Sequence, residues 1–256
     1  MLGLNKKHGE RAWRFAAAGK HPVAKDFLSI GQVFPLAGSL ADWMVRGYAG
    51  AGEPGGRSAC FWRFWMRGGG RDQIACGLLR GSCDSIGRPY PFLVLGAGPA
   101  PGWEQNWDRV PSACAGTWQQ MEKLCCGVFT DVSRLEQGVL SLKAPATDWG
   151  VSRDAAGPGR ESDPEPDPRT PPCLLRDQGY RDAEWLALPA TACADPAGDA
   201  ISRAGRILRD RSSGPPTAAF IGGSPGAPRY AVFRRPLKRA DFTRLWSEPA
   251  LKEDYP

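Results

Sequence analysis

Hydrophobic and polar residues alternate along residues 60–67 with the two-residue period of a β-strand. One face of this strand would carry Cys60, Trp62, Phe64 and Met66, and the other Phe61, Arg63, Trp65 and Arg67. The two arginines indicate that the second face contacts water. Residues 68–70 are three glycines, which suit a hairpin, and residues 73–79 read as the partner strand. Together with the apolar segment 92–95, this pattern predicts an antiparallel meander.

Other segments have the longer period of a helix. Trp118, Met121, Cys125 and Val128 recur at helical spacing within 103–129, and Pro111 divides that stretch into two segments. Further helices are predicted at 39–48 with Ser39 as N-cap, at 131–142, at 199–210 and at 240–246, and one or two helical turns are predicted at 182–188. The segment Gly96–Gly102 is interpreted as a strand-to-helix loop.

Strands are also predicted at 13–18, at 217–221 and at 230–233, the last two joined by a glycine-rich turn. Strand pairs therefore lie on both sides of a helical block, without regular strand–helix alternation. This order favours the α+β class, an antiparallel sheet sandwiched by helices, over a doubly wound sheet.

The chain is expected to form a single domain over residues 12–248. Residues 1–11 are predicted to be a flexible N-terminus and 249–256 a C-terminal tail. Residues 155–172 are rich in proline and acidic side chains and lack the apolar residues that offset the entropy of ordering. A mobile loop is expected there, with a partner-docking peptide as the alternative.

Charge and cysteine content narrow the function classes. Lys and Arg outnumber Asp and Glu by 33 to 27, but the basic residues are spread along the chain instead of forming the stripe of a nucleic-acid binder. The eight cysteines show no Cys-x-x-Cys spacing, so a zinc site is not expected. No apolar run has the length of a signal peptide or a membrane span. A cytoplasmic protein with reduced thiols, no membrane insertion and no nucleic-acid partner is the expectation.

Candidate catalytic groups are few. The Gly96–Gly102 segment has the wrong glycine spacing for a dinucleotide loop, and no Gly-x-x-x-x-Gly-Lys-Ser/Thr or Gly-x-Ser-x-Gly motif occurs. His21 lacks an evident nucleophile partner and is interpreted as a solvated loop residue. Asp26 and Asp84 leave two alternatives open. They could cap backbone amides, or they could hold a divalent metal in a hydrolase.

The stretch from Gly77 to Pro91 pairs a strand with a polar turn. Ser82 and Asp84 can cap backbone amides, Gly87 can take a positive φ angle, and Pro91 restricts the exit. Such a turn could carry chemistry or could be a rigid corner between two strands. The absence of a nucleophile, base or phosphate loop to serve it favours the corner.

The segment Gly19–Phe27 and the turn Gly81–Pro91, with Trp43 between them, form two motifs. They resemble the TagF family, also called ImpM, of bacterial type VI secretion. The first family motif is Gly-Lys-x-Pro-x-x-Gly-Asp-Phe, followed by a helix with a Trp, and the second is Pro-Ser-x-Asp-x-x-Gly-Arg-x-x-Pro. The matching residues here are Gly19, Lys20, Pro22, Asp26, Phe27, Trp43, Ser82, Asp84, Gly87, Arg88 and Pro91. Lys25 stands where the family usually has Gly, and Gly81 where it usually has Pro.

The resemblance implies a longin- or profilin-like fold and a non-catalytic cytoplasmic accessory protein without cofactor. It further implies a post-translational repressor that acts with a forkhead-associated scaffold protein. Because Asp26 and Arg88 both lie in polar turns at strand ends, we expect their side chains to approach each other. The surface around Lys20, Asp26, Asp84 and Arg88 is the expected contact for the scaffold.

Overall fold

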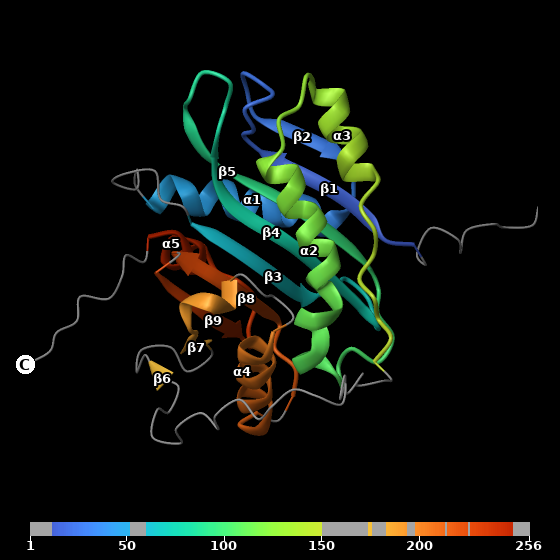
Figure 1. The fold of residues 1–256 in the computed structure, drawn as a ribbon, viewed down its shortest axis with the longest axis vertical. Helices are drawn as coiled ribbons and strands as arrows, with labels where there is room; N and C mark the ends of the chain where they lie inside the picture. The colour runs from blue at the N-terminus through green and yellow to red at the C-terminus, as the bar shows by residue number, and fades with distance from the viewer. Residues whose placement is uncertain are drawn as a thin grey trace, which may run out of the picture.

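The strands form one twisted sheet in the computed structural model (Figure 1). The structure describes residues 12–51, 60–149, 174–175, 183–193, 198–212, 214–224 and 226–247. Within these residues the sheet has nine strands in the order β2-β1-β5-β4-β3-β8-β9-β7-β6, and every neighbouring pair is antiparallel. The α+β prediction with an antiparallel sheet is confirmed.

The N-terminal part of the chain supplies five strands and three α-helices. In chain order they are β1 (Arg14–Gly19), β2 (Leu28–Gly31), α1 (Pro35–Ala51), β3 (Phe61–Arg67), β4 (Gln73–Cys83), β5 (Pro89–Pro99), the 3₁₀ turn η1 (Trp107–Arg109), α2 (Val110–Cys126) and α3 (Val132–Leu140). The predicted meander corresponds to β3, β4 and β5, with β4 between the other two.

The C-terminal part extends the same sheet. Its elements are β6 (Leu174–Leu175), β7 (Ala183–Ala187), the 3₁₀ turn η2 (Ala190–Cys193), α4 (Asp199–Asp210), β8 (Ala218–Ser224), β9 (Ala227–Phe233) and α5 (Arg239–Ser247). Strand β8 pairs with β3 from Phe61↔Gly223 to Met66↔Ala218, so the two parts of the chain share one hydrogen-bonded sheet.

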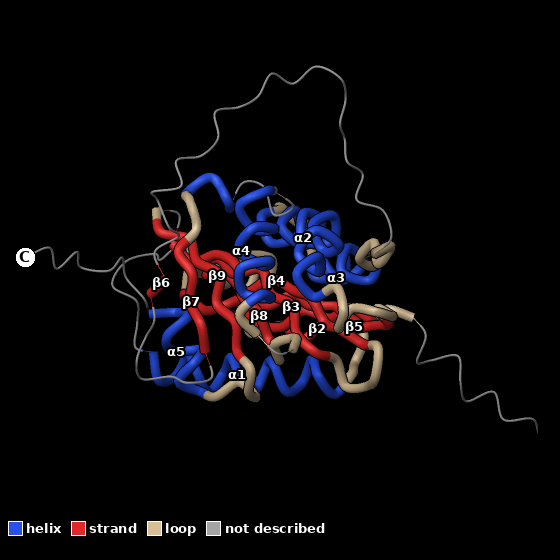
Figure 2. Tube along the Cα trace, turned by 90° about the horizontal axis from the view of Figure 1, so that it is seen from below, coloured by secondary structure: helices blue, strands red, loops and turns tan. Residues whose placement is uncertain are grey.

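Helices cover both faces of the sheet (Figure 2). Side chains from α2, α3 and α4 pack on one face, and side chains from α1 and α5 pack on the other. Arg63 of β3 is therefore not on a wet face, as its alternating position had suggested. It is 4% exposed, and its Nε lies 2.6 Å from Glu122 Oε1 of α2.

Several predicted elements have different bounds. Helix α1 begins four residues before Ser39, because Pro35 suits the first helical turn and the Phe34 carbonyl accepts the first helical amides. Pro111 lies in the first turn of α2, as its division of the stretch predicted. Val128 lies beyond the end of α2 and is fully exposed, so it does not continue the buried stripe.

Two segments have a different structure from the one predicted. Residues 182–188 contain strand β7, in which Trp185 and Leu186 point to opposite faces and both are buried. Because both faces are covered, this strand shows no polar alternation. The segment Gly96–Gly102 continues β5 to Pro99, and a Cβ at Gly96 would lie 2.3 Å from the Phe15 ring of β1. Glycine is needed there for close aromatic packing, not for a loop.

The remaining expectations concern reduced cysteines, membrane-spanning helices, and the segments at the two ends and at 155–172. In the described part of the chain, Cys60, Cys76, Cys114 and Cys125 are free and buried. No helix among these residues has both the length and the apolar character needed to cross a bilayer. The segments 1–11, 155–172 and 249–256 lie outside the described residues.

Candidate functional site

Two loops meet at one end of the sheet, where β1 leads into β2 and β4 turns into β5 (Figure 1). Gly19 ends β1 with φ of 123°, and a Cβ on it would lie 2.1 Å from the carbonyl oxygen of Pro91. The amide of Lys20 donates to that same oxygen at 3.2 Å. Only glycine permits this approach of the two backbones. We call the structure formed by residues 19–27 and 82–91 the corner.

Asp84 organises the β4–β5 turn. Its Oδ1 accepts hydrogen bonds from the amides of Ile86 at 3.2 Å and Arg88 at 2.9 Å, and its carbonyl accepts the Gly87 amide at 2.9 Å. Gly87 has the positive φ of 84° that this tight return requires. The prediction that Asp84 caps backbone amides is confirmed. Ser82 lies in strand β4 opposite Tyr90, so it does not form part of the turn.

A buried carboxylate joins the two motifs. The Lys20 ammonium lies 3.0 Å from Asp84 Oδ2, and Arg88 Nε lies 2.6 Å from the same oxygen. The Asp84 side chain is fully buried, whereas the Arg88 side chain is half exposed. The ion pairs thus connect the end of β1 to the β4–β5 turn through one carboxylate.

Arg88 also reaches back to the β1–β2 loop. Its Nη2 donates to the carbonyl of Lys25 at 2.6 Å and to Asp26 Oδ1 at 3.2 Å. The predicted approach of Asp26 and Arg88 is confirmed. The amide of Ser85 adds a backbone hydrogen bond of 2.8 Å to Ala24, so the two loops are cross-linked at several points.

This network fixes the charge of Asp84. Burial acts to raise the pKa of its carboxyl, but hydrogen bonds from the Arg88 amide, Lys20 and the Arg88 guanidinium outweigh burial and hold the pKa well below its ordinary range. The same contacts with Asp84 and Asp26 raise the pKa of Arg88. An always-ionised carboxylate whose two oxygens are occupied by donors suits a structural tie better than proton transfer.

The two departures from the family motifs have local explanations. Lys25 uses its backbone carbonyl to bind Arg88, and its φ is not among the positive values found in the described residues. A glycine is therefore not required at that position. Gly81 donates its amide to the Cys60 carbonyl at 3.0 Å, a hydrogen bond that a proline could not make.

Aromatic residues border the charged cluster. The ring of Phe27 contacts Tyr90 at 5.8 Å, and Tyr90 contacts Tyr48 of α1 at 4.7 Å. Phe27 and Ile86 are 44% and 59% exposed, so the outer surface of the corner carries apolar groups. Tyr48, Ile86 and Tyr90 were missed by sequence reasoning, although Ile86 and Tyr90 lie within the second motif.

His21 is not a solvated loop residue, as its sequence context had suggested. It is 1% exposed, and its ring packs against Phe92 at 5.2 Å and Phe129 at 5.7 Å. Its Nδ1 accepts the Val23 amide at 3.2 Å, which requires the neutral ring with its proton on Nε2. Burial lowers the pKa of His21, the Leu124 backbone partly offsets this effect, and the charge of Arg80 adds to it.

Most of the predicted site residues meet in the corner. Those that line it or hold its backbone are Gly19, Lys20, Asp26, Phe27, Asp84, Gly87, Arg88 and Pro91. Pro22 is exposed on the β1–β2 loop. Trp43 is not part of the corner, because it lies on α1 against Phe242 of α5, and its indole nitrogen donates to the Lys238 carbonyl at 2.8 Å.

The carboxylates of the corner do not converge on a common position for a metal. Asp84 and Asp26 both face Arg88, which separates them. Across the described residues, no group of three or more His, Cys, Asp or Glu side chains is close enough together to hold a metal ion.

Comparison with known proteins places this arrangement in a family. The model of the TagF N-terminal domain, described as type VI secretion system-associated, matches residues 16–144, which is half of the chain. The chain belongs to the TagF family. Both motifs of the corner fall within this TagF match, whereas β7, β8, β9, α4 and α5 lie beyond it.

A solved structure shares the fold of this chain over a longer span. The crystal structure of PA0076 from Pseudomonas aeruginosa PAO1 aligns with 94% of this chain and 98% of its own, with a TM-score of 0.52 and 18% sequence identity. At this identity the similarity shows the fold alone. A search among curated proteins found no match.

Proposed function

We propose that this chain is a non-catalytic accessory protein of the type VI secretion system. It represses secretion after translation, in the cytoplasm, by binding a forkhead-associated scaffold protein through the corner. The family match supports the association with type VI secretion. The repressive role, the scaffold partner and the binding surface belong to the proposal.

The outer surface of the corner is the observation that carries this proposal. Phe27 and Ile86 expose 44% and 59% of their surface on loops that are cross-linked by Asp84 and Arg88. Apolar side chains presented on a rigid polar frame are typical of protein–protein contacts. The exposed half of the Arg88 side chain adds a charged anchor beside them.

The rival function, a metal-dependent hydrolase built on Asp26 and Asp84, gains no support from the geometry. Both oxygens of Asp84 accept donors from the protein itself, and the Asp26 side chain is 84% exposed. A catalytic acid or base needs a free position toward the substrate. Asp84 has no such position, and Asp26 stands beside the positive charge of Arg88, which opposes a bound cation.

Two finer points of the fold belong to the same proposal. We take the sheet with helices on both faces to be related to longin or profilin domains, and residues 12–248 to act as one domain. The continuous pairing of β3 with β8 supports the second point, because it joins the family-matched part to the rest of the chain.

Binding between the full chain and the purified forkhead-associated scaffold protein tests the proposal. The variant Phe27→Ser/Ile86→Ser removes the exposed apolar groups without changing charge, and binding should weaken at least about tenfold, as for interface hot spots. Val33→Ser is the matched control, since Val33 is 96% exposed and lies beyond the other end of β2. It should leave binding unchanged.

The same variants can be tested in cells by measuring secretion. In a strain that lacks the chain, complementation with Val33→Ser should restore repression of secretion, whereas Phe27→Ser/Ile86→Ser should not. If the native chain fails to bind the scaffold, the partner is wrong. If it binds and both variants bind equally well, the corner is not the contact surface.

A further inference from the structure

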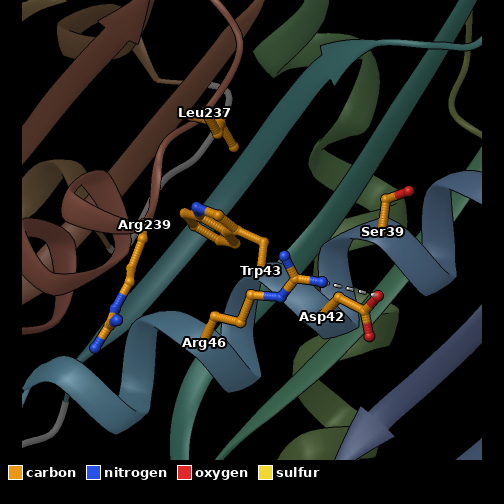
Figure 3. A pocket seen from close by; sticks show the side chains of 6 residues that line it. All are labelled: Ser39, Asp42, Trp43, Arg46, Leu237 and Arg239. Atoms are coloured by element: carbon orange, nitrogen blue, oxygen red, sulfur yellow. Dashed lines mark ion pairs between the residues drawn. The ribbon is translucent and has the colours of Figure 1, made fainter.

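A surface depression of about 360 Å³ lies between α1 and the segment that leads into α5 (Figure 3). The residues that line it are Ser39, Asp42, Trp43, Arg46, Leu237 and Arg239. Four of them come from α1, and Leu237 and Arg239 come from a part of the chain that the family match does not cover. The depression is therefore a composite of two regions far apart in the sequence.

The aromatic wall of this depression is held in place. The Trp43 indole nitrogen donates to the Lys238 carbonyl at 2.8 Å, which ties α1 to the 237–239 segment. The Trp43 and Phe242 rings also make a T-shaped contact, with centroids 5.1 Å apart. With its nitrogen occupied and its position fixed, the half-buried indole offers an apolar surface to a bound segment.

Two glycines on α1 determine how closely Arg239 and α5 approach that helix. A Cβ at Gly50 would lie 2.5 Å from Nη2 of Arg239, and a Cβ at Gly47 would lie 2.3 Å from Cβ of Phe242. These two positions let α5 and the Arg239 side chain approach the helix closely. The Arg239 side chain thus lies close to α1, and Figure 3 shows Trp43 between Arg239 and Arg46.

The charges around the depression are not balanced. Among the described residues, Arg239 and its neighbour Lys238 make no ion pair, and both are exposed. Asp42 is the carboxylate in the lining, and it lies 4.0 Å from Arg46 with both side chains more than two-thirds exposed. An exposed pair at that distance contributes little. The arginine donors are available to a ligand.

We propose that this depression binds an acidic peptide segment of a partner protein. Carboxylates of the segment pair with Arg46 and Arg239, and an apolar side chain between them lies against Trp43. Guanidinium groups bind carboxylates through paired hydrogen bonds, which favours arginine over lysine in such a site. Asp42 repels a negative charge placed beside it. A nucleic-acid strand carries a phosphate at every nucleotide and meets this repulsion, whereas a peptide can place an uncharged residue there.

This inference goes beyond the proposed function, because it concerns a different surface. The corner is formed by the β1–β2 and β4–β5 loops, whereas the depression is formed by α1 and the approach to α5. Either surface could be occupied without the other, and the variants below leave the corner unchanged.

The test measures fluorescence anisotropy of a labelled peptide with alternating Asp and Leu residues, titrated with the full chain. Arg46→Glu/Arg239→Glu should weaken binding at least about tenfold, because it opposes like charges. Arg71→Glu/Arg206→Glu is the matched control. Both residues are exposed and lie outside the lining, and the two substitutions change the net charge by the same amount as the test variant does. The control should bind within about twofold of the native chain, because exposed distant charges are screened by salt.

A third variant should change binding in the opposite direction. Asp42→Asn removes the negative charge from the lining and should strengthen peptide binding. Raising the salt concentration should weaken peptide binding in every variant that still binds. Melting curves report whether each variant folds. If Arg46→Glu/Arg239→Glu does not fold, Arg46→Glu alone replaces it, with the same expected direction.

Three results would overturn the proposal. The native chain could fail to bind the peptide at millimolar concentration, or the control could weaken binding as much as the double variant. A single-stranded oligonucleotide could also bind more tightly than the peptide and depend on the same two arginines, which would assign the site to nucleic acid.

Discussion

The corner and the depression on α1 use charged residues in opposite ways. In the corner, Lys20 and Arg88 converge on the buried carboxylate of Asp84, so the charges satisfy one another. In the depression, Arg46 and Arg239 flank an aromatic ring, and the carboxylate nearest to Arg46 lies at the limit of ion pairing. Charges of the first kind hold loops in place, and charges of the second kind are free to hold something else.

This contrast lets contributions to stability be separated from contributions to recognition. Substitutions of the buried charge network around Asp84 should change the stability of the fold first and binding through it. Substitutions of the depression's arginines should leave stability unchanged and alter binding alone. Unfolding and binding measured on the same variants can therefore test this contrast.

The largest effect on stability is expected from Gly19→Ala. The new Cβ would lie 2.1 Å from the Pro91 carbonyl oxygen, at a φ of 123° that alanine rarely adopts. We expect a loss of roughly 3 kcal/mol or more in the free energy of unfolding. Gly69→Ala is the control because nothing lies within 4 Å of its Cβ position, and it should change stability by about 0.5 kcal/mol or less. Urea titration measures both.

A smaller but clear loss is expected from Asp84→Asn. The amide keeps the shape of the side chain but leaves Lys20 and Arg88 without their shared charge. Asp26→Asn should cost much less, because the Asp26 side chain is 84% exposed and makes one ion pair with Arg88. Equal urea midpoints for the two variants would contradict the view of Asp84 as the tie between the motifs.

The pH dependence of stability should report on His21. Burial lowers the pKa of His21 from 6.5, so the unfolded chain binds the proton more tightly than the folded chain. The free energy of unfolding should therefore fall as pH drops below 6.5, down to the lowered pKa. A second loss should begin below 3.8, where the unfolded chain protonates Asp84 before the folded chain does.

The variant His21→Asn isolates the first of these losses. Asparagine can still accept the Val23 amide but does not titrate, so the decline that begins below pH 6.5 should become flatter while the decline below pH 3.8 stays. Urea unfolding at a series of pH values measures both. An unchanged profile would show that another group causes the first decline.

The smallest effect is expected from Arg46→Gln. The Arg46 side chain is 75% exposed and lies 4.0 Å from Asp42, so its loss should change the free energy of unfolding by about 0.5 kcal/mol or less. Binding of the acidic peptide should nevertheless weaken measurably. A large loss of stability would mean that this arginine is structural, and the contrast with the corner would fail.

Much of the corner could be predicted because its two motifs contain the residues that determine the backbone geometry. Gly19 and Gly87 mark positions with positive φ, and Asp84 marks a cap, each a local property of the chain. The approach of Asp26 and Arg88 could also be predicted, since both lie at strand ends. The burial of His21 could not, because it depends on Phe129, which is distant in sequence.

The fold shows the same division between local and long-range information. Strand β3 was predicted from its alternation, but Arg63 was assigned to a wet face because its partner, Glu122, lies on a helix 59 residues later. Strand β7 was interpreted as helical because burial on both faces hides the period of two. The depression went unpredicted because α1 and the 237–239 segment come together only in the folded chain.

The pairing of β3 with β8 limits how the chain can be divided for experiments. A fragment that ends at residue 144, where the family match ends, would lack β8 and leave β3 as a sheet edge. It would also lack α5, which packs over Trp62 with the Leu245 carbonyl 2.9 Å from the indole nitrogen. Exposed aromatic edge strands favour aggregation. Expression plans should therefore keep the half that the family match omits.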